Sequence, residues 1–452
     1  MKRYEEYKPM KYDWLPEVPV HWETRTMRSF TTVSSERRGD REATLLSVYR
    51  EYGVVIMASR DDNRNVESED LSNYKWVRPG DLVMNKMKMW QGSLGVSEHE
   101  GIVSPAYIVC HINDMTLNRR YLHTLLRSTG FKTYYNQYSY GVRVGQWDMH
   151  YEDFKGLEIA LPPVSEQDQI VRYLDWQVSK INRLIAVKRK QIAVLQEHRT
   201  AKINNAVTRG LNRDVSFVKS GYNWLPDIPS NWKPVPAKAL FRSVSEFRRD
   251  DDPMLAATQK YGLIEQAEYM RLEGRRIVLA NDNLDKWLHT EPKDFIISLR
   301  SFQGGLEMCN KPGCVTWHYV VLRPQRDVYP EFYKWFFKSA AYIGALQKTS
   351  DFIRDGQDLR FSNFIKVGLF FIPMDEQKEI AAYLDREIPK YDALIEMLEK
   401  QIVQITEYRT RLISDVVTGQ EDVRGIEVPE YEFVEDPTEE HEDEQKGETD
   451  EE

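Results

Sequence analysis

The sequence lacks the abundant cysteines and the long apolar runs that are typical of secreted and membrane proteins. Its 452 residues include three cysteines, Cys110, Cys309 and Cys314, which are too few for a disulfide framework and have no histidine doublet nearby to complete a zinc site. We expect all three to be reduced and structural. No apolar run approaches twenty residues, and the opening MKRYEEYKPM has no signal-peptide pattern. The sequence therefore predicts a cytoplasmic protein with no membrane segment.

Signatures of catalysis are missing as well. The sequence contains no G-x-x-x-x-G-K-[ST] phosphate loop, no H-E-x-x-H pair and no G-x-G-x-x-G after a strand. The stretch LPPV at 161–164 is not the N/D-P-P-Y/F motif of amino-methyltransferases, and the nine histidines are scattered. These absences favour a binding and assembly protein over an enzyme.

Acidic residues are concentrated at the C-terminus. The net charge is -9, but residues 427–452 contain 14 acidic residues and one basic residue, Lys446. The tail thus contributes -13, and residues 1–426 have a charge of +4. Because the tail has no periodic apolar pattern, residues 421–452 are predicted to be disordered. The tail either solvates the protein or competes with DNA phosphate for a basic surface.

What the sequence does contain is a duplication. Residues 164–208 recur as residues 374–418, with every matched pair offset by 210. In the second copy, apolar residues recur at alternating steps of four and three, which is the heptad pattern of a helix that packs along another helix. About 44 helical residues at ~1.5 Å each reach roughly 66 Å. The two copies are therefore expected to pair within the chain, antiparallel, as a spacer; pairing in a homodimeric coiled coil is the alternative.

The heptad seam includes polar residues. Lys188 interrupts the apolar seam of the first copy, and Arg199 and Arg409 occupy equivalent seam positions in the two copies. The matched pairs between the copies are Glu166/Glu376, Gln167/Gln377, Tyr173/Tyr383, Leu174/Leu384, Asp175/Asp385, Leu184/Leu394, Ile185/Ile395, Gln191/Gln401, Ile192/Ile402, Arg199/Arg409, Thr200/Thr410, Ile203/Ile413 and Val207/Val417.

A module of about 150 residues precedes each helix. Each opens on a Trp-Pro cluster, YDWLPEVPVHW at 12–22 and YNWLPDIPSNW at 222–232, again offset by 210. Short β-branched and aromatic runs bounded by Gly, Pro and Asp follow, and they are typical of strands and turns. We expect an α+β protein with an internal pseudo-twofold duplication. Its predicted parts are module 1 (1–160), helix 1 (161–211), module 2 (212–372), helix 2 (373–420) and the tail (421–452).

Basic and amide side chains gather in the turns of both modules. Arg binds guanine and phosphate, and Gln binds adenine, so these residue types are suited to contacting DNA. Solvated surface charge is the alternative for any one of them. The candidate DNA-binding residues are Arg37, Arg38, Arg60, Arg64, Lys86, Lys88, Gln91, Arg143 and Gln146 in module 1, and Arg248, Arg249, Arg300, Gln303, Arg354, Gln357 and Arg360 in module 2.

The combination resembles the DNA-specificity (S) subunit of type I restriction–modification systems. The resemblance rests on the W-L-P-x-x-P-x-x-W opener, the LPPVSEQ and FIPMDEQ entries to the helices, the VTRGL exit at 207–211, and the repetition of the arrangement. It covers the chain to about residue 426 and does not explain the acidic tail.

The resemblance implies two mixed α/β target recognition domains joined by two long antiparallel helices. Each domain would recognise one half of a bipartite site on double-stranded DNA. Two modification subunits would bind S-adenosylmethionine and perform methyl transfer, and two restriction subunits would use ATP and Mg. This chain would bind no cofactor of its own and perform no catalysis. A stand-alone DNA-binding regulator or scaffold on the same duplicated frame is the alternative function.

Overall fold

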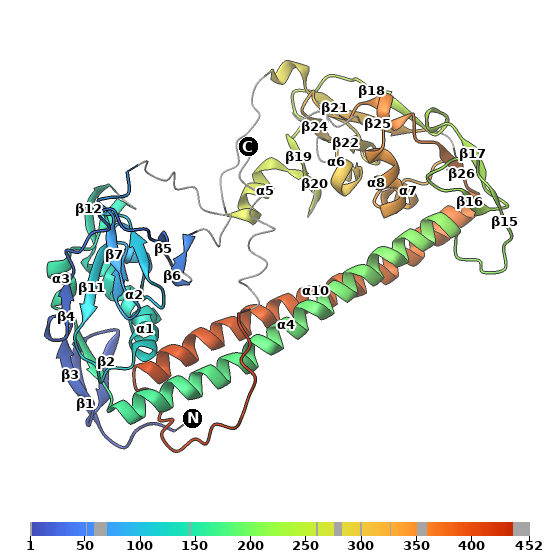
Figure 1. Ribbon diagram of the computed structural model, residues 1–452. Coiled ribbons are helices and arrows are strands. Elements are labelled where there is room, and N and C mark those ends of the chain that lie inside the picture. The colour runs from blue at the N-terminus through green and yellow to red at the C-terminus, as the bar shows by residue number, and fades with distance from the viewer. Residues whose placement is uncertain are drawn as a thin grey trace. The chain divides into compact units, whose positions relative to one another are not determined.

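The computed structural model describes residues 2–50, 52–57, 70–143, 146–258, 261–274, 283–298, 301–325, 327–349 and 359–436 (Figure 1). The chain forms two compact units. Unit 1 comprises Met1–Arg189 with Glu399–Glu452, and unit 2 comprises Lys190–Leu398. Because both divisions fall inside the long helices, each unit contains one module and a segment of each helix. The predicted boundaries between modules and helices therefore stay predictions.

Each unit is built on a four-stranded antiparallel sheet, and the two sheets have the same topology. The order is β4-β11-β8-β9 in unit 1 and β18-β25-β22-β23 in unit 2. The strands are β4 (Thr31–Val33), β8 (Leu82–Met84), β9 (Leu94–Val96), β11 (Ile108–Ile112), β18 (Phe241–Val244), β22 (Phe295–Ile297), β23 (Glu307–Met308) and β25 (Val320–Pro324).

Antiparallel strand pairs surround each sheet, and four pairs of unit 1 have a counterpart in unit 2. In unit 1 they are β1 (Tyr7–Tyr12) with β2 (Leu15–Pro19), β3 (Glu23–Thr26) with β14 (Glu158–Leu161), β5 (Leu46–Tyr49) with β6 (Gly53–Ile56), and β7 (Lys75–Val77) with β10 (Gly101–Val103). In unit 2 they are β15 (Phe217–Lys219) with β16 (Asp227–Pro229), β17 (Lys233–Val235) with β26 (Leu369–Phe371), β19 (Leu255–Thr258) with β20 (Gly262–Glu265), and β21 (Leu288–Thr290) with β24 (Gly313–Val315). A further hairpin in unit 1 joins β12 (Tyr140–Arg143) to β13 (Gln146–Asp148).

Short helices complete the modules. The sequence predicts helices at 121–127 and 331–338, which the structure shows as α1 (Arg119–Arg127) and α7 (Pro330–Phe336). It misses the helices that follow them, α2 (Thr129–Tyr138) and α8 (Ala340–Gln347). The sequence of α2, TGFKTYYNQY, is rich in residues that favour strands. Burial of its aromatic side chains against the core overrides that preference. The remaining short helices are α3 (Tyr151–Lys155), α5 (Gln266–Glu273), α6 (Ser301–Gly304), α9 (Phe361–Phe364) and the 3-10 turns η1 (Met27–Ser29), η3 (Met89–Gln91), η4 (Ala237–Ala239) and η5 (Leu284–Lys286).

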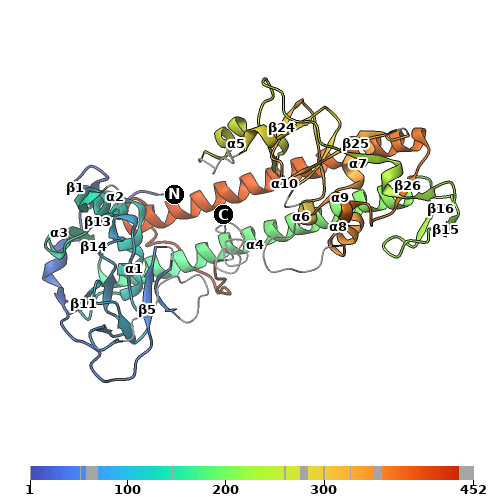
Figure 2. The same cartoon turned by 90° about the horizontal axis from the view of Figure 1, so that it is seen from above.

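The two long helices begin and end within one residue of the repeated stretches 164–208 and 374–418. They are α4 (Val164–Arg209) and α10 (Met374–Val417), and Pro389 lies inside α10 without ending it. Within each unit the segments of α4 and α10 lie side by side and antiparallel (Figures 1 and 2). The pairing within one chain confirms the predicted antiparallel coiled coil and differs from the homodimeric alternative.

Polar side chains in the seam fix this antiparallel register. In unit 1, Lys188 Nζ donates to Gln401 Oε1 at 2.6 Å. In unit 2, Arg199 Nε donates to Asp392 Oδ1 at 2.7 Å. Each bond can form in only one alignment of the two helices, so a shift by one turn would leave a charged group without its partner.

Each hydrophobic core combines a module with the start of one long helix and the end of the other. In unit 1, Ile170 and Ile185 of α4 and Val416 of α10 are fully buried among module residues. In unit 2, Ala206 of α4 and Ile380 of α10 have the positions equivalent to Val416 and Ile170, and both are buried. Folding of a module and pairing of the helices in the same unit are therefore coupled.

The repeated Glu-Gln motif connects each module to its helix. Glu166 Oε1 accepts hydrogen bonds from the Tyr4 hydroxyl at 2.6 Å and from Trp22 Nε1 at 3.0 Å, so it anchors the Trp-Pro opener. Gln167 Oε1 accepts from the backbone N–H of Asn118, which precedes α1, at 2.9 Å. In unit 2, Gln377 repeats this role by accepting from the backbone N–H ahead of α7 at 2.8 Å. The glutamine of the motif thus has the same structural role in both units.

Residues 421–436 differ from the expected disordered tail. Val423 is buried in the unit 1 core, and Ile426 and Val428 pack against it. The following residues run beside α4 and are bonded to it, for example through the Asn182 amide and the Val434 carbonyl at 3.0 Å. The acidic composition hid the apolar residues that dock this segment. Residues 437–452 lie outside the described part of the chain.

A half-buried histidine, His123, predicts acid sensitivity in unit 1. Val96 N donates to His123 Nδ1 at 3.2 Å, and burial, followed by the charge of Arg127, lowers the pKa of His123 to about 4. The folded state therefore binds fewer protons than the unfolded state between about pH 6.5 and 4, and stability falls as pH falls through this range. We expect a loss of about 2–3 kcal/mol by pH 4.5.

Urea unfolding curves measured between pH 7 and 4.5 test this, with His123→Gln as the matched variant. The difference in unfolding free energy between the two proteins should shrink as pH falls, because the variant has no proton to gain. A difference that does not change with pH would contradict the assignment.

Candidate nucleic-acid interface

The loop that joins β8 to β9 presents basic and aromatic side chains outward from a fixed base. Met89 of η3 is fully buried, while Lys88 is exposed and Lys86 and Trp90 are half-buried. Gly92 closes the turn with a φ of +91°, a conformation that suits glycine. The buried methionine and the backbone bonds of the turn hold the cationic residues in defined positions.

The β12–β13 hairpin packs against this loop. Met149 N donates to the carbonyl of Lys86 at 3.0 Å, and Lys86 Nζ lies 3.4 Å from Asp148. The rings of Trp90 and Trp147 meet edge to face with centroids 5.3 Å apart. Two segments that the sequence predicted separately thus form one surface. Arg143 and Gln146 pair across the hairpin backbone, but their side chains lie outside the described part.

A third segment brings Arg37 to the same surface through Lys75, a residue that the sequence did not single out. Arg37 and Lys75 form an isolated antiparallel bridge. Burial, and then the positive charges of Arg37 and Lys86, lower the pKa of Lys75. Lys75 Nζ donates to the carbonyl of Tyr107, so the backbone holds Lys75 in place between the positive charges of Arg37 and Lys86. We call Arg37, Lys75 and Lys86 the cationic cluster. The sequence contains one indication of Lys75, which is its position at the start of a strand between two basic turns.

Arg38 lies in a turn that other arginines stabilise. Its Nε donates to the Arg41 carbonyl at 2.7 Å, and it is half-buried. Arg41 stacks on Trp76, with its guanidinium carbon 3.9 Å from the ring centroid, and pairs with Glu36 at 2.9 Å. This packing leaves Arg37 as the more exposed of the two predicted arginines.

Equivalent backbone bonds align the two units and correct one match made from the sequence. Arg38 N donates to the carbonyl of Tyr74, and Arg248 N donates to the carbonyl of Trp287, both at 2.8 Å. Arg38 therefore corresponds to Arg248. By sequence, the double arginines Arg37-Arg38 and Arg248-Arg249 match each other, and this match is wrong by one position. The residue equivalent to Arg37 is Phe247, which is 68% exposed.

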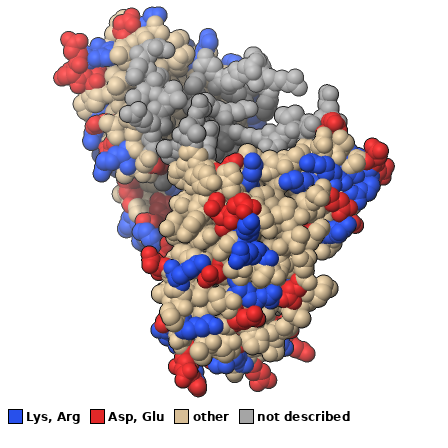
Figure 3. Space-filling view, turned by 90° about the vertical axis from the view of Figure 1, so that its left-hand side faces the viewer, with Lys and Arg blue, Asp and Glu red and all other residues tan. Residues whose placement is uncertain are grey.

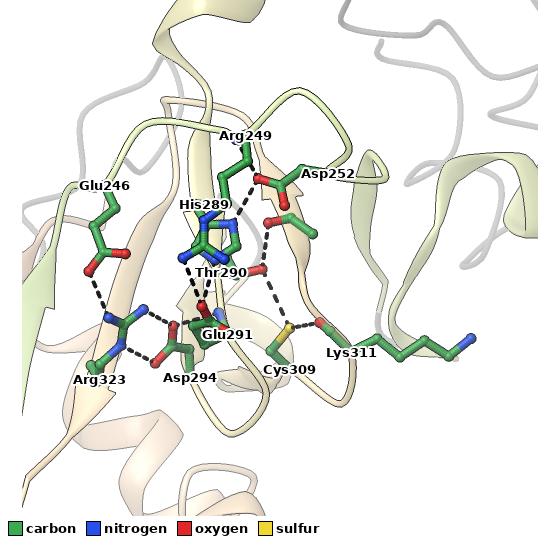
Figure 4. A network of polar contacts seen from close by, with 11 residues as sticks. Glu246, Arg249, Asp252, His289, Thr290, Glu291, Asp294, Cys309, Lys311 and Arg323 are labelled. Carbon is green, nitrogen blue, oxygen red and sulfur yellow. Dashed lines mark hydrogen bonds and ion pairs between the residues drawn. The ribbon is translucent and has the colours of Figure 1, made fainter.

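In unit 2, Arg249 belongs to a polar network around a buried histidine (Figure 4). Arg249 Nη2 lies 3.0 Å from Glu291, and His289 contacts Glu291 at 2.9 Å and Asp252 at 2.7 Å. Burial disfavours the charge on His289, but the hydrogen bonds to Glu291 and Asp252 outweigh it and raise the pKa. Arg249 is thus held in an ion pair, which reduces its charge toward a ligand.

The same network extends to Arg323. Its guanidinium donates two hydrogen bonds to the buried carboxylate of Asp294, at 2.9 and 2.8 Å, and one to Glu246 at 2.7 Å (Figure 4). In unit 1 the equivalent carboxylate, Asp81, contacts His111 at 2.7 Å. Both units thus have a buried aspartate in the turn before β8 or β22. Its partner is a histidine in unit 1 and an arginine in unit 2.

The structure places the other candidates singly or does not describe them. Gln91 is half-buried, and Gln303 and Arg360 are exposed at α6 and beside α9. Figure 3 shows Lys and Arg side chains interspersed with Asp and Glu on the face it presents. The candidates outside the described residues are Arg60, Arg64, Arg300, Arg354 and Gln357.

Neither a metal site nor a membrane span is found in the described part of the chain. No group of three or more His, Cys, Asp or Glu side chains there is placed to hold a metal ion. No described helix combines the length and apolarity needed to cross a membrane. Cys110, Cys309 and Cys314 are buried and unbridged, and burial raises the pKa of the Cys110 thiol to about 12.

The fold is that of type I specificity subunits. The crystal structure of the HsdS subunit from Thermoanaerobacter tengcongensis matches with a TM-score of 0.50 at 15% identity, over 91% of this chain and 100% of that chain. A structure titled for complex assembly and conformational transition of the type I R-M system matches with a TM-score of 0.65 at 13% identity, over 89% and 99% of the two chains.

A curated relative agrees with the structures. A Methanocaldococcus jannaschii protein, provisionally named the MjaX specificity subunit of a type I restriction enzyme, is 21% identical over 436 residues, covering 89% of this chain and 94% of the relative. No protein-family model matches the chain. The resemblance identified from the sequence is therefore confirmed over almost its whole length.

Proposed function

We propose that this chain is the DNA sequence-specificity subunit of a type I restriction–modification complex. The observation that carries the proposal is the duplication of a module with its long helix, on a fold shared with HsdS over 91% of the chain. Each module recognises one half of a bipartite site, because the two modules share a frame but differ in their exposed loops. The helix pair sets the unrecognised spacer between the halves.

The chemistry of the unit 1 loops supports DNA as the ligand. The cluster of Arg37, Lys75 and Lys86 can neutralise phosphates, and such contacts supply most of the non-specific affinity for DNA. Lys88 and Trp90 beside it offer a further donor and an aromatic surface. In unit 2 the equivalent of Arg37 is Phe247, a residue suited to apolar contact with a thymine methyl group.

The chemistry of modification and cleavage belongs to partners in this proposal. Two modification subunits bind S-adenosylmethionine and transfer the methyl group, and two restriction subunits use ATP and Mg. This chain supplies sequence recognition and the frame on which the modification subunits assemble. Its two-fold duplication fits two copies of one partner, because each unit offers a similar helix pair.

Affinity purification of the full chain from its host, combined with long-read methylation mapping, tests the proposal. We expect a methyltransferase subunit at two copies per chain and a methylated bipartite motif that disappears when this chain is deleted. Recovery of the chain with DNA but without a methyltransferase would instead support a stand-alone regulator or scaffold and would refute the specificity role.

Replacing Lys86 with alanine is expected to weaken DNA binding several-fold at low salt. If Lys86 contacts one phosphate, the slope of log affinity against log salt should fall by about 1. Arg28→Ala, which removes an exposed cation at η1 that belongs neither to the loop nor to the hairpin, is the control and should leave both quantities unchanged. Fluorescence anisotropy between 50 and 200 mM salt measures them, and equal losses in the two variants would argue against a contact by Lys86.

A further inference from the structure

The C-terminal segment is docked on α4 in unit 1 by a series of specific contacts. We call residues 427–436 the strap. Gln169 Nε2 donates to the Ile426 carbonyl at 2.7 Å, just before the strap begins. Val434 N then donates to Ser179 Oγ at 3.2 Å, and Asn182 Nδ2 donates to the Val434 carbonyl at 3.0 Å. The strap therefore follows α4 in the same direction for about three to four turns.

None of the α4 side chains that hold the strap is repeated at the equivalent position of α10. The offset of 210 replaces Gln169 with Glu379, Ser179 with Pro389, Asn182 with Asp392 and Arg183 with Ala393. Proline and alanine provide no donor or cation, and the two carboxylates would repel an acidic segment. Sequence and structure thus restrict strap binding to unit 1.

The strap also supplies a charge that the duplicated frame lacks in unit 1. In unit 2 the seam residue Arg199 pairs with Asp392 of α10 at 2.7 Å. In unit 1 the equivalent Arg409 faces the neutral Asn182, at 2.7 Å from its Oδ1. Asp436 of the strap lies 2.5 Å from Arg409. In unit 2, the carboxylate that pairs with the seam arginine therefore belongs to the opposite helix. In unit 1, it belongs to the strap.

The strap rests on the helix pair without being part of its core. Beyond Val428 its large apolar side chains are turned outward, and Phe433 is 56% exposed. The pair Arg183–Glu432 at 3.1 Å is 59% and 84% exposed, so it contributes little and weakens with salt. A cavity of about 610 Å³ lies between the segment and Gln169 and Arg172 of α4. These features describe a segment that can detach while the helices stay paired.

We propose that the strap is a removable cover that makes the two docking surfaces for the modification subunits unequal. The inference rests on the proposed function. Two copies of one modification subunit present the same surface to both units. A surface that fits the α10 face of unit 2, which the strap does not contact in the described part of the chain, can occupy the α4 face of unit 1 only by displacing the strap. The partner therefore binds unit 2 first and unit 1 second.

Displacing the strap lowers the affinity of the second step. The charge-assisted contact between Asp436 and Arg409 and two backbone hydrogen bonds must be broken. We expect the second copy to bind about tenfold more weakly or worse, which corresponds to a loss of about 1.4 kcal/mol or more. High salt should narrow the difference, because it screens the strap's ion pairs.

Asn182→Asp tests the attachment without any partner. The new carboxylate gives Arg409 the ion pair that Asp392 gives Arg199, repels Asp436 and removes the donor to Val434. Amide hydrogen exchange of residues 428–436 in the full chain should accelerate at least tenfold, while exchange within α4 and α10 stays slow. Asp392→Asn in unit 2 is the matched control and should leave the strap protected. Unchanged exchange in Asn182→Asp would overturn the attachment.

Binding of the methyltransferase subunit that co-purifies with the chain tests the consequence. The wild-type chain should bind two copies in two steps of unequal affinity, measured by calorimetry and native mass spectrometry. Asn182→Asp and a chain ending at residue 426 should bring the two affinities within about threefold. A chain ending at residue 436 keeps the strap and should retain the difference. Comparison of the two truncated chains separates the effect of the strap from the effect of residues 437–452.

Equal affinities in the wild-type chain, or inequality that survives loss of the strap, would overturn the inference and leave the proposed function standing. Failure of every variant to bind a methyltransferase subunit would overturn both. If the shortened chain does not fold, Asn182→Asp still tests the inference. We expect this variant to fold, because it introduces in unit 1 an ion pair that unit 2 already contains.

Discussion

Exchange of residues 1–160 for the equivalent module of another chain of this fold is expected to replace one half of the recognised DNA site and leave the other half unchanged. The physical reason is that the exposed loops of unit 1, including Lys86, Lys88 and Trp90, belong to module 1 and rest on its own buried residues. The Glu166 and Gln167 contacts stay available to any module that keeps the tryptophan at the opener and the backbone N–H before α1.

Methylation mapping of a host that expresses the exchanged chain measures the outcome. The reciprocal exchange of residues 212–372 is the matched control and should alter the other half of the site. An altered sequence in both halves after either exchange would contradict independent recognition by the two modules. Loss of all methylation would be traced by co-purification, which reports whether the modification subunits still assemble on the exchanged chain.

Insertion of seven residues after Gln191 in α4 and after Leu398 in α10 is expected to lengthen the unrecognised spacer or to abolish activity. Seven residues add about 10.5 Å of helix and leave a rotation of only about 20°. That length corresponds to about three base pairs of B-form DNA at ~3.4 Å each. Both sites fall between the cross-helix contacts of Lys188 with Gln401 and of Arg199 with Asp392, so both contacts are kept.

The single insertion in α4 alone is the control, because it moves Arg199 away from Asp392 while the contacts of unit 1 stay in place. That variant should lose methylation altogether. The recognised motif, mapped in cells that express the double insertion, should contain a longer spacer between unchanged halves. Full activity on the original spacing would refute the role of the helix pair in setting it.

The long helices were predictable because their signals are local. The heptad pattern in the repeated stretches 164–208 and 374–418 predicted α4 and α10 to within one residue at each end. The helix α2 was missed because packing outweighs the strand preference of its residues, and α8 was missed because eight residues give too short a pattern. Tyr135 in α2 and Tyr342 in α8 are fully buried, and that burial cannot be deduced from ten residues of sequence.

The candidate interface was only partly predictable. The turn at 86–91 and the segment at 143–146 were identified separately, but the bond from Met149 to Lys86 that joins them comes from the fold. Lys75 was missed because a single lysine at the start of a strand has no periodic signal. Arg249 was chosen for its charge, whereas the structure pairs it with Glu291.

The sequence by itself determined the duplication, the two long helices and the α+β modules, because repeats, heptads and turn residues are properties of neighbouring positions. The tertiary structure decided which cations come together and how residues 421–436 dock. Both depend on contacts between positions far apart in the chain, such as Arg37 with Lys75 and Asn182 with Arg409. An acidic segment alone predicts solvation. A seam arginine without a carboxylate in the opposite helix gives that segment a place to bind.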